Sequence, residues 1–300
     1  MSRPAALRQG DGVAVVAPSS PFDRDRFERG VRTLQEMGFE PRFGEGIHAR
    51  DVAGYLAGPD TRRLDELLRA LRDSSARAIV LARGGYGLLR IAMGIPRELV
   101  TKAVVGYSDT TVLHELWSRA GVPSVHGPMC TQLGEDASVV KRLRTLLYGA
   151  VPEPLRWTAR TVRPGRAEAP LRGGNLAVLA SLCGTPLQPS FRGAIVLLED
   201  LNEPAYRLDR LCTQLLLAGA FAGAAAFVVG DLSAAGEDNE GRDEAVAERL
   251  STVGVPVVLG APFGHADRNQ PVALGVRHAL DAEQGSLTQL EPMLEKSAAS

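Results

Sequence analysis

Apolar residues along the first half of the chain alternate between two spacings. Short runs such as residues 12–18 (GVAVVAP) and 76–82 (ARAIVLA) are apolar almost throughout, as in strands that are buried on both faces. Between them, residues 23–38 carry apolar side chains at every third or fourth position, as in a helix that packs one side against a sheet. Strands that alternate with helices of this length predict parallel pairing and a layered α/β domain.

The second half shows the same alternation after a break at residues 150–172. That stretch holds four prolines and five arginines, a composition that favours a connector. A chain of 300 residues is also long for a single hydrophobic core. We therefore expect an N-terminal α/β domain at residues 1–150, a connector at 151–172 and a smaller C-terminal α/β domain at 173–300.

One uncharged stretch, residues 211–230, is as long as a membrane span. Thr213 and Gln214 are polar, however, and Gly219 and Gly223 stand where a helix could end. The pattern favours a helix, a glycine turn and a buried strand over a helix that crosses a membrane.

Composition narrows the possible partners and the location. The net charge is −1, with 45% hydrophobic and 23% charged residues, so no excess of positive charge points to nucleic acid or an anionic membrane. Three widely spaced cysteines form no disulfide framework and no metal-binding pair, which indicates a reducing compartment and no metal site. Because the N-terminus also lacks the apolar segment of a signal peptide, we expect a cytoplasmic protein.

The segment 102–116 (KAVVGYSDTTVLHEL) is the first candidate for chemistry. A predicted strand ends at Gly106, and Ser108 then opens a helix. Ser108 is either the N-cap of that helix or a nucleophile on a sharp strand–turn–helix. Gly106 suits the nucleophile, but Thr110 stands where the usual G-x-S-x-G pattern has glycine. The local sequence does not choose between the two roles.

Other strand ends carry groups that a serine nucleophile would need. The glycine loop at 83–87 (RGGYG) fits neither phosphate-binding pattern, and its backbone N–H groups could form an oxyanion hole or simply a tight turn. His126 and His265 each end a predicted strand, and both are candidates for the general base. Glu199 ends an apolar strand and could orient the base, or it could belong to a salt-bridge cluster with nearby arginines.

Five segments of the chain can be compared with a known family. They are LARGGYGLLRI, GYSDTTVLHE, RGGNLAVLASLCGTP, LLEDLNEPAYRLDRLCTQLLLAG and APFGHADR. In order and spacing they resemble the murein LD-carboxypeptidases, a family of serine peptidases that includes the microcin C immunity proteins. The resemblance covers nearly the whole chain, from about Gly12 to about Gly275.

The resemblance implies roles for three side chains. Ser108 corresponds to the nucleophile and Glu199 to the acid. The base corresponds to His265, which decides the choice between this residue and His126. A triad is recognised by its geometry, so the order Ser–Glu–His along the chain is acceptable. Because Ser108 belongs to the first predicted domain and the other two residues to the second, the resemblance implies a site formed by both domains.

The resemblance also implies backbone donors and a substrate anchor. The family's oxyanion hole corresponds to the backbone N–H groups of Gly85 and Asp109. A carboxypeptidase must hold the terminal carboxylate of its substrate, and Arg83 or Arg172 could do so. The sequence does not choose between these two arginines.

The function implied by the resemblance is that of a cytoplasmic serine carboxypeptidase. It would hydrolyse an L,D-peptide bond and release terminal D-Ala from murein tetrapeptides during peptidoglycan recycling, without a metal or organic cofactor. The family also implies a homodimer. One alternative is the same triad acting on peptidyl- or aminoacyl-nucleotides, as in the microcin immunity branch. An alternative of another class is a non-catalytic α/β ligand-binding protein, in which Ser108 is only a cap.

Overall fold

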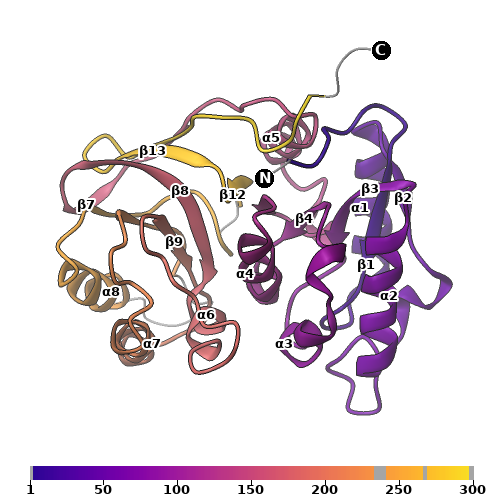
Figure 1. The fold of residues 1–300 in the computed structure, drawn as a ribbon, viewed down its shortest axis with the longest axis horizontal. Helices are drawn as coiled ribbons and strands as arrows, with labels where there is room; N and C mark the ends of the chain where they lie inside the picture. The colour runs from indigo at the N-terminus through magenta and orange to yellow at the C-terminus, as the bar shows by residue number, and fades with distance from the viewer. Residues whose placement is uncertain (1–2, 233–240, 266–268, 297–300) are drawn as a thin grey trace. The chain divides into compact units, whose positions relative to one another are not determined.

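The predicted alternation of strands and helices is present in the structure (Figure 1). The computed structural model describes residues 3–232, 241–265 and 269–296. Within them, the N-terminal half builds a sheet of parallel strands with helices packed against it, and the C-terminal half builds a second, mixed sheet. The predicted α/β class is therefore confirmed.

The chain divides into two units, and the first takes segments from both ends of the sequence. This first unit comprises the chain up to Ala150, together with Pro271–Ala273 and the segment from Pro292 onward. The second unit comprises Val151–Gln270 and Leu274–Glu291.

The first unit is built on a six-stranded sheet with the order β12-β5-β4-β3-β1-β2. Its strands are β1 (Gly12–Val16), β2 (Glu40–Arg42), β3 (Ala76–Leu81), β4 (Ala103–Gly106), β5 (Ser124–His126) and β12 (Val272–Leu274). The strands from β2 to β5 pair in parallel with their neighbours. β1 and β4 are buried at every residue, as their unbroken apolar runs predict.

The helices of the first unit are those expected from the apolar spacing. They are α1 (Arg24–Glu36), α2 (Asp60–Arg72), α3 (Leu88–Ile91), α4 (Thr111–Ala120) and α5 (Ala137–Leu147). α1 begins where the Asp23 carboxylate accepts a hydrogen bond from the N–H of Arg26, and it buries Phe27 and Leu34. α4 ends at Gly121, whose φ of 75° is typical of a left-handed helix cap.

The strand order brings three loops together at one edge of the first sheet. β1 lies between β3 and β2, so the chain leaves β1 and β3 toward opposite sides of the sheet. In open α/β sheets, ligands collect at the carboxyl ends of the strands near such a reversal. The loops that follow β1, β3 and β4 there contain residues 17–21, 83–87 and 107–110.

The second unit is built on an eight-stranded sheet with the order β6-β14-β13-β8-β9-β10-β11-β7. Its strands are β6 (Leu155–Arg156), β7 (Arg160–Arg163), β8 (Arg166–Asn175), β9 (Ile195–Glu199), β10 (Ala226–Val229), β11 (Val257–Leu259), β13 (Arg277–Asp281) and β14 (Ser286–Gln289). Its helices are α6 (Leu176–Ser181), α7 (Ala205–Leu217) and α8 (Arg242–Ser251). β8 to β11 pair in parallel, and the outer strands pair antiparallel.

The arginine-rich residues 151–172, expected to connect two domains, carry strands of the second sheet. They supply β6, β7 and the first part of β8. β6 and β7 form the two edges of the sheet, and most residues of β7 are exposed. Charged residues on edge strands discourage pairing with other chains, so a composition typical of a linker also suits these strands.

The uncharged residues 211–230 are split between two elements of the second unit. α7 ends at Leu217 and β10 begins at Ala226. Gly219 and Gly223 lie between them, both at positive φ. The predicted helix, glycine turn and buried strand are confirmed. Throughout the described ranges, every helix falls short of the length and apolar character that crossing a bilayer demands.

Candidate active site

Ser108 lies in a sharp turn between β4 and α4. Its φ is 61°, and Asn202 is the only other non-glycine residue with a left-handed backbone among the described positions. This conformation costs an ordinary residue about 1–3 kcal/mol, and such strain is concentrated at functional turns. It reverses the chain from strand to helix within two residues, as in a nucleophile elbow. The predicted strand–turn–helix at Ser108 is therefore present.

The alternative role of Ser108 as a helix cap finds no support in the hydrogen bonds. Ser108 begins a short 3₁₀ turn, and α4 itself begins at Thr111. In this continuously described stretch, neither the turn nor the helix is capped by a side chain. Ser108 is partly exposed, and its hydroxyl is not engaged as a cap.

Two glycines allow the chain to close around Ser108. A Cβ atom on Gly84 would lie 3.1 Å from Cβ and 3.3 Å from Oγ of Ser108, so the glycine loop touches the serine. A Cβ atom on Gly106 would lie 2.5 Å from Oγ1 of Thr110. Thr110, which departs from the usual pattern, thus packs against the glycine that stands two residues before the serine.

The glycine loop is held by the loop that follows β1. The N–H of Ser20 donates to the carbonyl oxygen of Gly84 over 3.2 Å, and the N–H of Tyr86 donates to Ser20 Oγ over 3.1 Å. Gly85 lies between these two bonds with a φ of 106°, and a Cβ atom on it would lie 2.3 Å from Ser20 Oγ. Only glycine fits this position, for reasons of both backbone and space.

The buried side chain of Asp109 is a feature beside Ser108 that the sequence did not indicate. Only its backbone N–H was expected to take part, but its carboxylate is 3% exposed and accepts hydrogen bonds from Ser19 Oγ (2.7 Å) and from the N–H of Leu88 (3.0 Å). Burial raises the pKa of Asp109 to about 6, although these two bonds and the charge of Arg63 favour the ionised form. Burial of an acid directly after a serine has no signature in the local sequence.

Two buried histidines pack within the first unit beside Gly106, two residues before Ser108. His126, the competing candidate for the base, is fully buried on β5 opposite Gly106, with its ring centroid 5.7 Å from that of Tyr107. His114 is also buried, and its ring nitrogens lie 3.0 Å from the carbonyl oxygen of Gly106 and 2.9 Å from Ser124 Oγ. His114 thus ties α4 to β4 and β5.

The second unit contains a hydrogen-bonded pair of an acid and an imidazole. Glu199 ends β9 and is fully buried, while the His265 side chain is 16% exposed. Nδ1 of His265 lies 2.7 Å from Oε2 of Glu199. A carboxylate at this position selects the tautomer with the proton on Nδ1, which leaves the lone pair on Nε2. This arrangement has the geometry of the acid–base half of a Ser–His–acid triad.

The surroundings of His265 favour its protonation. Burial lowers the pKa of the imidazole, but the hydrogen bond to Glu199 and the negative charges of Glu199, Asp200 and Asp231 raise it. The net result is a pKa above the ordinary value of 6.5. An imidazole of this kind is a stronger base than a free histidine side chain.

The position before His265 requires a glycine, Gly264, for reasons of both backbone angle and space. Its φ is 104°, and a Cβ atom on it would lie 2.8 Å from Cβ and 3.2 Å from Oε2 of Glu199. Its N–H donates to Oδ1 of the buried Asn269 over 3.1 Å. The backbone therefore passes directly beside Glu199, which brings His265 within hydrogen-bond distance of the carboxylate.

A second buried carboxylate, Asp200, supports the end of β9. It accepts hydrogen bonds from Asn175 Nδ2 (3.1 Å) and from the N–H groups of Ala177 (2.8 Å) and Leu201 (2.8 Å). Burial and the charge of Glu199 raise the pKa of Asp200 to about 7. Asn175 also lies opposite Glu199 in the ladder between β8 and β9. The ends of these two strands, residues 173–175 and 198–200, therefore lie side by side.

The two candidate anchors for a substrate carboxylate both contact backbone carbonyls. Arg83 is exposed, and its Nη1 donates to the carbonyl oxygen of Pro21 over 2.6 Å. Arg172 lies on β8, where its Nη1 donates to Ser190 O over 2.6 Å and its guanidinium stands 5.6 Å from the ring centroid of Phe191. Arg83 belongs to the glycine loop itself.

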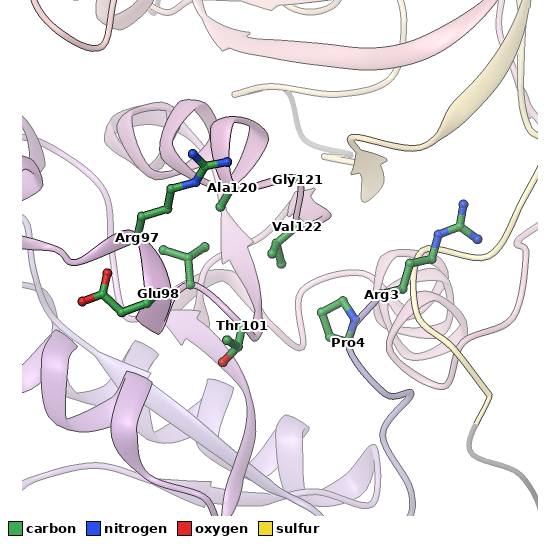
Figure 2. A pocket seen from close by; sticks show the side chains of 9 residues that line it. Arg3, Pro4, Arg97, Glu98, Thr101, Ala120, Gly121 and Val122 are labelled. Carbon is green, nitrogen blue, oxygen red and sulfur yellow. The ribbon is translucent and has the colours of Figure 1, made fainter. Parts of the chain in front are cut away.

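Among the residues that the structure describes, neither a metal-binding cluster nor the hollow in Figure 2 points to another active site. Within the described part of the chain, no group of three or more histidines, cysteines or acids could hold a metal ion. The hollow, of about 600 Å³, is lined by residues that include Arg97, Thr101 and Val122 (Figure 2). Thr101 and Val122 precede β4 and β5, so the hollow lies at the opposite end of these strands from Ser108.

Comparisons with known proteins cover both halves of the chain. Residues 13–127 match the LD-carboxypeptidase N-terminal domain, and residues 168–280 match the LD-carboxypeptidase C-terminal domain. A Streptomyces coelicolor protein that carries a carboxypeptidase name is 38% identical over 97% of both chains. A murein tetrapeptide carboxypeptidase of Pseudomonas aeruginosa is 29% identical over 91% of this chain and 94% of its own.

The fold has a counterpart among solved structures. An MccF-like protein from Bacillus anthracis superposes with a TM-score of 0.86 at 22% identity, over 97% of this chain and all of that protein. The resemblance recognised in the sequence is confirmed. The chain belongs to the LD-carboxypeptidase family of peptidases.

Proposed function

We propose that this protein is a cytoplasmic serine carboxypeptidase that cleaves the L,D-peptide bond of murein tetrapeptides and releases the terminal D-Ala, a step of peptidoglycan recycling. The observation that carries the proposal is the 2.7 Å contact between His265 Nδ1 and Glu199 Oε2 in a chain of this family. The strained turn at Ser108 supports this residue as the matching nucleophile. The name of the Pseudomonas aeruginosa relative supports the choice of substrate.

The first half of the proposed reaction forms an acyl-enzyme. Nε2 of His265 takes the proton of the Ser108 hydroxyl while Oγ attacks the carbonyl carbon of the L,D bond. The oxygen of the tetrahedral intermediate accepts hydrogen bonds from the N–H groups of Gly85 and Asp109. His265 then returns the proton to the departing amine, and free D-Ala leaves.

The second half regenerates the enzyme. His265 takes a proton from a water molecule, which attacks the ester carbonyl, and the proton passes to Ser108 Oγ as the tripeptide leaves. Glu199 remains ionised throughout and stabilises the imidazolium that forms in each half. The mechanism requires Ser108 of the first unit to reach His265 of the second, and it needs no metal or organic cofactor.

The proposal also assigns a role to two arginines. Arg83 and Arg172 are the candidate anchors for the carboxylate of D-Ala. Arg83 is favoured by its place in the glycine loop, which contacts Ser108 through Gly84.

By analogy with the family we also propose that the protein is a homodimer. Light scattering of the purified protein would measure its oligomeric state.

The test is a digest of murein tetrapeptide followed by mass spectrometry. The wild-type protein should remove one alanine, and Ser108→Ala should remove none. Ser118→Ala, on the same helix, should behave as the wild type and is the matched control. A tetrapeptide that ends in L-Ala should be cleaved far more slowly, because the enzyme acts on an L,D bond.

One further substrate and one covalent label separate this proposal from its alternatives. Preferential cleavage of an aminoacyl sulfamoyl adenylate would assign the protein to nucleotide-conjugate hydrolysis instead. A serine-directed phosphonate should label the wild type and Ser118→Ala but not Ser108→Ala. A wild-type protein that takes no label and cleaves neither substrate would be a binding protein, and the catalytic proposal would be wrong.

A further inference from the structure

Two buried side chains of opposite charge join the same pair of loops in the first unit. Arg63 is 0% exposed, and its Nη1 donates to the carbonyl oxygens of Pro18 and, over 2.9 Å, Gly87. Asp109 accepts from the next residue of each loop, Ser19 and Leu88. One cation therefore binds two carbonyls and one anion binds two donors, at adjacent positions in the same two loops. We call Arg63 and Asp109 the loop clamp.

The loop clamp encloses the segment expected to provide the oxyanion hole. Residues 83–87 contain three glycines, which have many accessible backbone conformations and lose much entropy when fixed. Ser20 fixes this loop at Gly84 and Tyr86, and the clamp fixes it at Gly87 and Leu88. Together these contacts hold the backbone on both sides of Gly85.

The buried charges of the clamp are compensated within the first unit. Arg63 also donates through Nε to Gly58 O (3.2 Å) and through Nη2 to Asp60. Asp60 in turn accepts from Arg90, which follows the glycine loop on α3. A buried charge that lost such partners would be costly, so the loops are held in the position in which all of these bonds form.

We propose that the carboxylate of Asp109, acting with Arg63, is a positioning group that fixes the glycine loop so that the Gly85 N–H faces the same point as the N–H of Asp109 itself. The inference rests on the proposed function and adds a role for a side chain. An oxyanion hole stabilises charge only when its donors are aimed before the reaction, at about 2.7–3.1 Å from the oxygen. Asp109 would supply one donor directly and aim the other through the clamp.

Hydrogen exchange tests the clamp without any substrate. Asp109→Ala should raise the exchange rates of the Tyr86 and Leu88 amides by about tenfold or more, since the loop loses a fixed contact. Asp109→Asn, whose amide oxygen can accept both bonds, should keep most of the protection. Thr33→Val removes a buried hydroxyl that donates only within α1 and should leave the loop unchanged. Unaltered exchange in Asp109→Ala would overturn the proposal.

Steady-state kinetics tests whether the loop clamp contributes to the rate of the reaction. Asp109→Ala should lower kcat by about 10²-fold with KM within about threefold, because an oxyanion donor acts mainly in the transition state. Asp109→Asn should recover at least about tenfold of that loss, and Ser19→Ala should fall between the two. A rise in KM without a fall in kcat, or an Asn variant as impaired as the Ala variant, would contradict a positioning role.

The two experiments separate this inference from the proposed function. A wild-type protein that cleaves no L,D-peptide would refute the proposed function, whereas the exchange rates would still decide whether Asp109 holds the glycine loop. An active wild type with equal exchange in all variants would leave the function standing and remove the clamp.

Discussion

At the scale of single residues, the buried contact between Glu199 and His265 sets the pH range of the proposed chemistry. The pKa of His265 lies above 6.5 because the hydrogen bond and the neighbouring negative charges outweigh burial. A general base must be neutral, so the acidic limb of kcat/KM should lie above pH 6.5. Protonated His265 also stabilises the fold, an effect fully present below pH 6.5 and lost as the pH rises through the folded pKa.

Glu199→Gln tests this assignment. We expect kcat to fall by up to about 10⁴-fold, because an amide does not impose the tautomer with the proton on Nδ1. The acidic limb of the remaining activity should move to lower pH, since burial then acts on His265 without its closest negative charge. Glu203→Gln, which removes the partner of Arg207, is the control. An unshifted limb measured by pH–rate profiles would refute the role of Glu199.

Gly264 provides a second test at the residue scale. Gly264→Ala places a methyl group 2.8 Å from Glu199 Cβ at a φ of 104°. We expect a loss of at least about 10²-fold in kcat from displacement of His265, and a fall in unfolding free energy above the ~1–3 kcal/mol of the backbone strain alone. Gly254→Ala, at a φ of 82° with nothing within 4 Å, measures that strain by itself. Equal effects of the two substitutions on activity would contradict the contact with Glu199.

At the scale of elements, the loops that follow the strands form the candidate site, and the strands hold these loops in place. The glycine loop after β3 and the turn after β4 meet because Gly84 has no side chain. Gly84→Ala requires no unusual backbone angle, so its cost should be local: less than about 1 kcal/mol in stability, but about 10²-fold in kcat. Gly44→Ala, which would contact nothing within 4 Å, is the matched control for thermal unfolding and turnover. Full activity in Gly84→Ala would show that the loop does not constrain Ser108.

Local patterns predicted the elements well where an element is buried on one face or on both. The spacing of Phe27 and Leu34 predicted α1, and the unbroken apolar run of β1 predicted a buried strand. The edge strands β6 and β7 were not predicted, because they are short and carry arginines, with prolines beside them, instead of an apolar run.

The candidate site was predictable only in part, for a similar reason. Ser108 and Glu199 stand at the ends of apolar strands, where the change from apolar to polar residues makes them visible. Gly264–His265 lie in the loop between β11 and β12, beyond the short strand that the apolar run predicted there. The buried carboxylate of Asp109 and the buried guanidinium of Arg63 were not predicted. Charged residues are usually exposed, and their burial depends on partners in distant loops that no local pattern reveals.

At the scale of the whole molecule, the first unit depends on residues from the far end of the chain. β12 joins its sheet beside β5, and Nε of Arg142 donates to Pro271 O over 2.8 Å. Near the N-terminus, the N–H of Ala6 donates to Glu295 O over 2.7 Å. Such pairings between distant segments leave no periodic signal, so the sequence alone could not place them. A cut at residue 150 would therefore remove part of the first unit's own structure.

The separately expressed halves, residues 1–150 and 151–300, test this dependence and the proposed triad together. The first half should unfold at a lower temperature than the whole chain, because its sheet loses β12 and the contacts of the C-terminal segment. Neither half should hydrolyse murein tetrapeptide, since Ser108 lies in one and the Glu199–His265 pair in the other. His265→Ala in the full chain, folded but inactive, separates loss of chemistry from loss of structure. Normal turnover by the isolated first half would refute a triad drawn from both units.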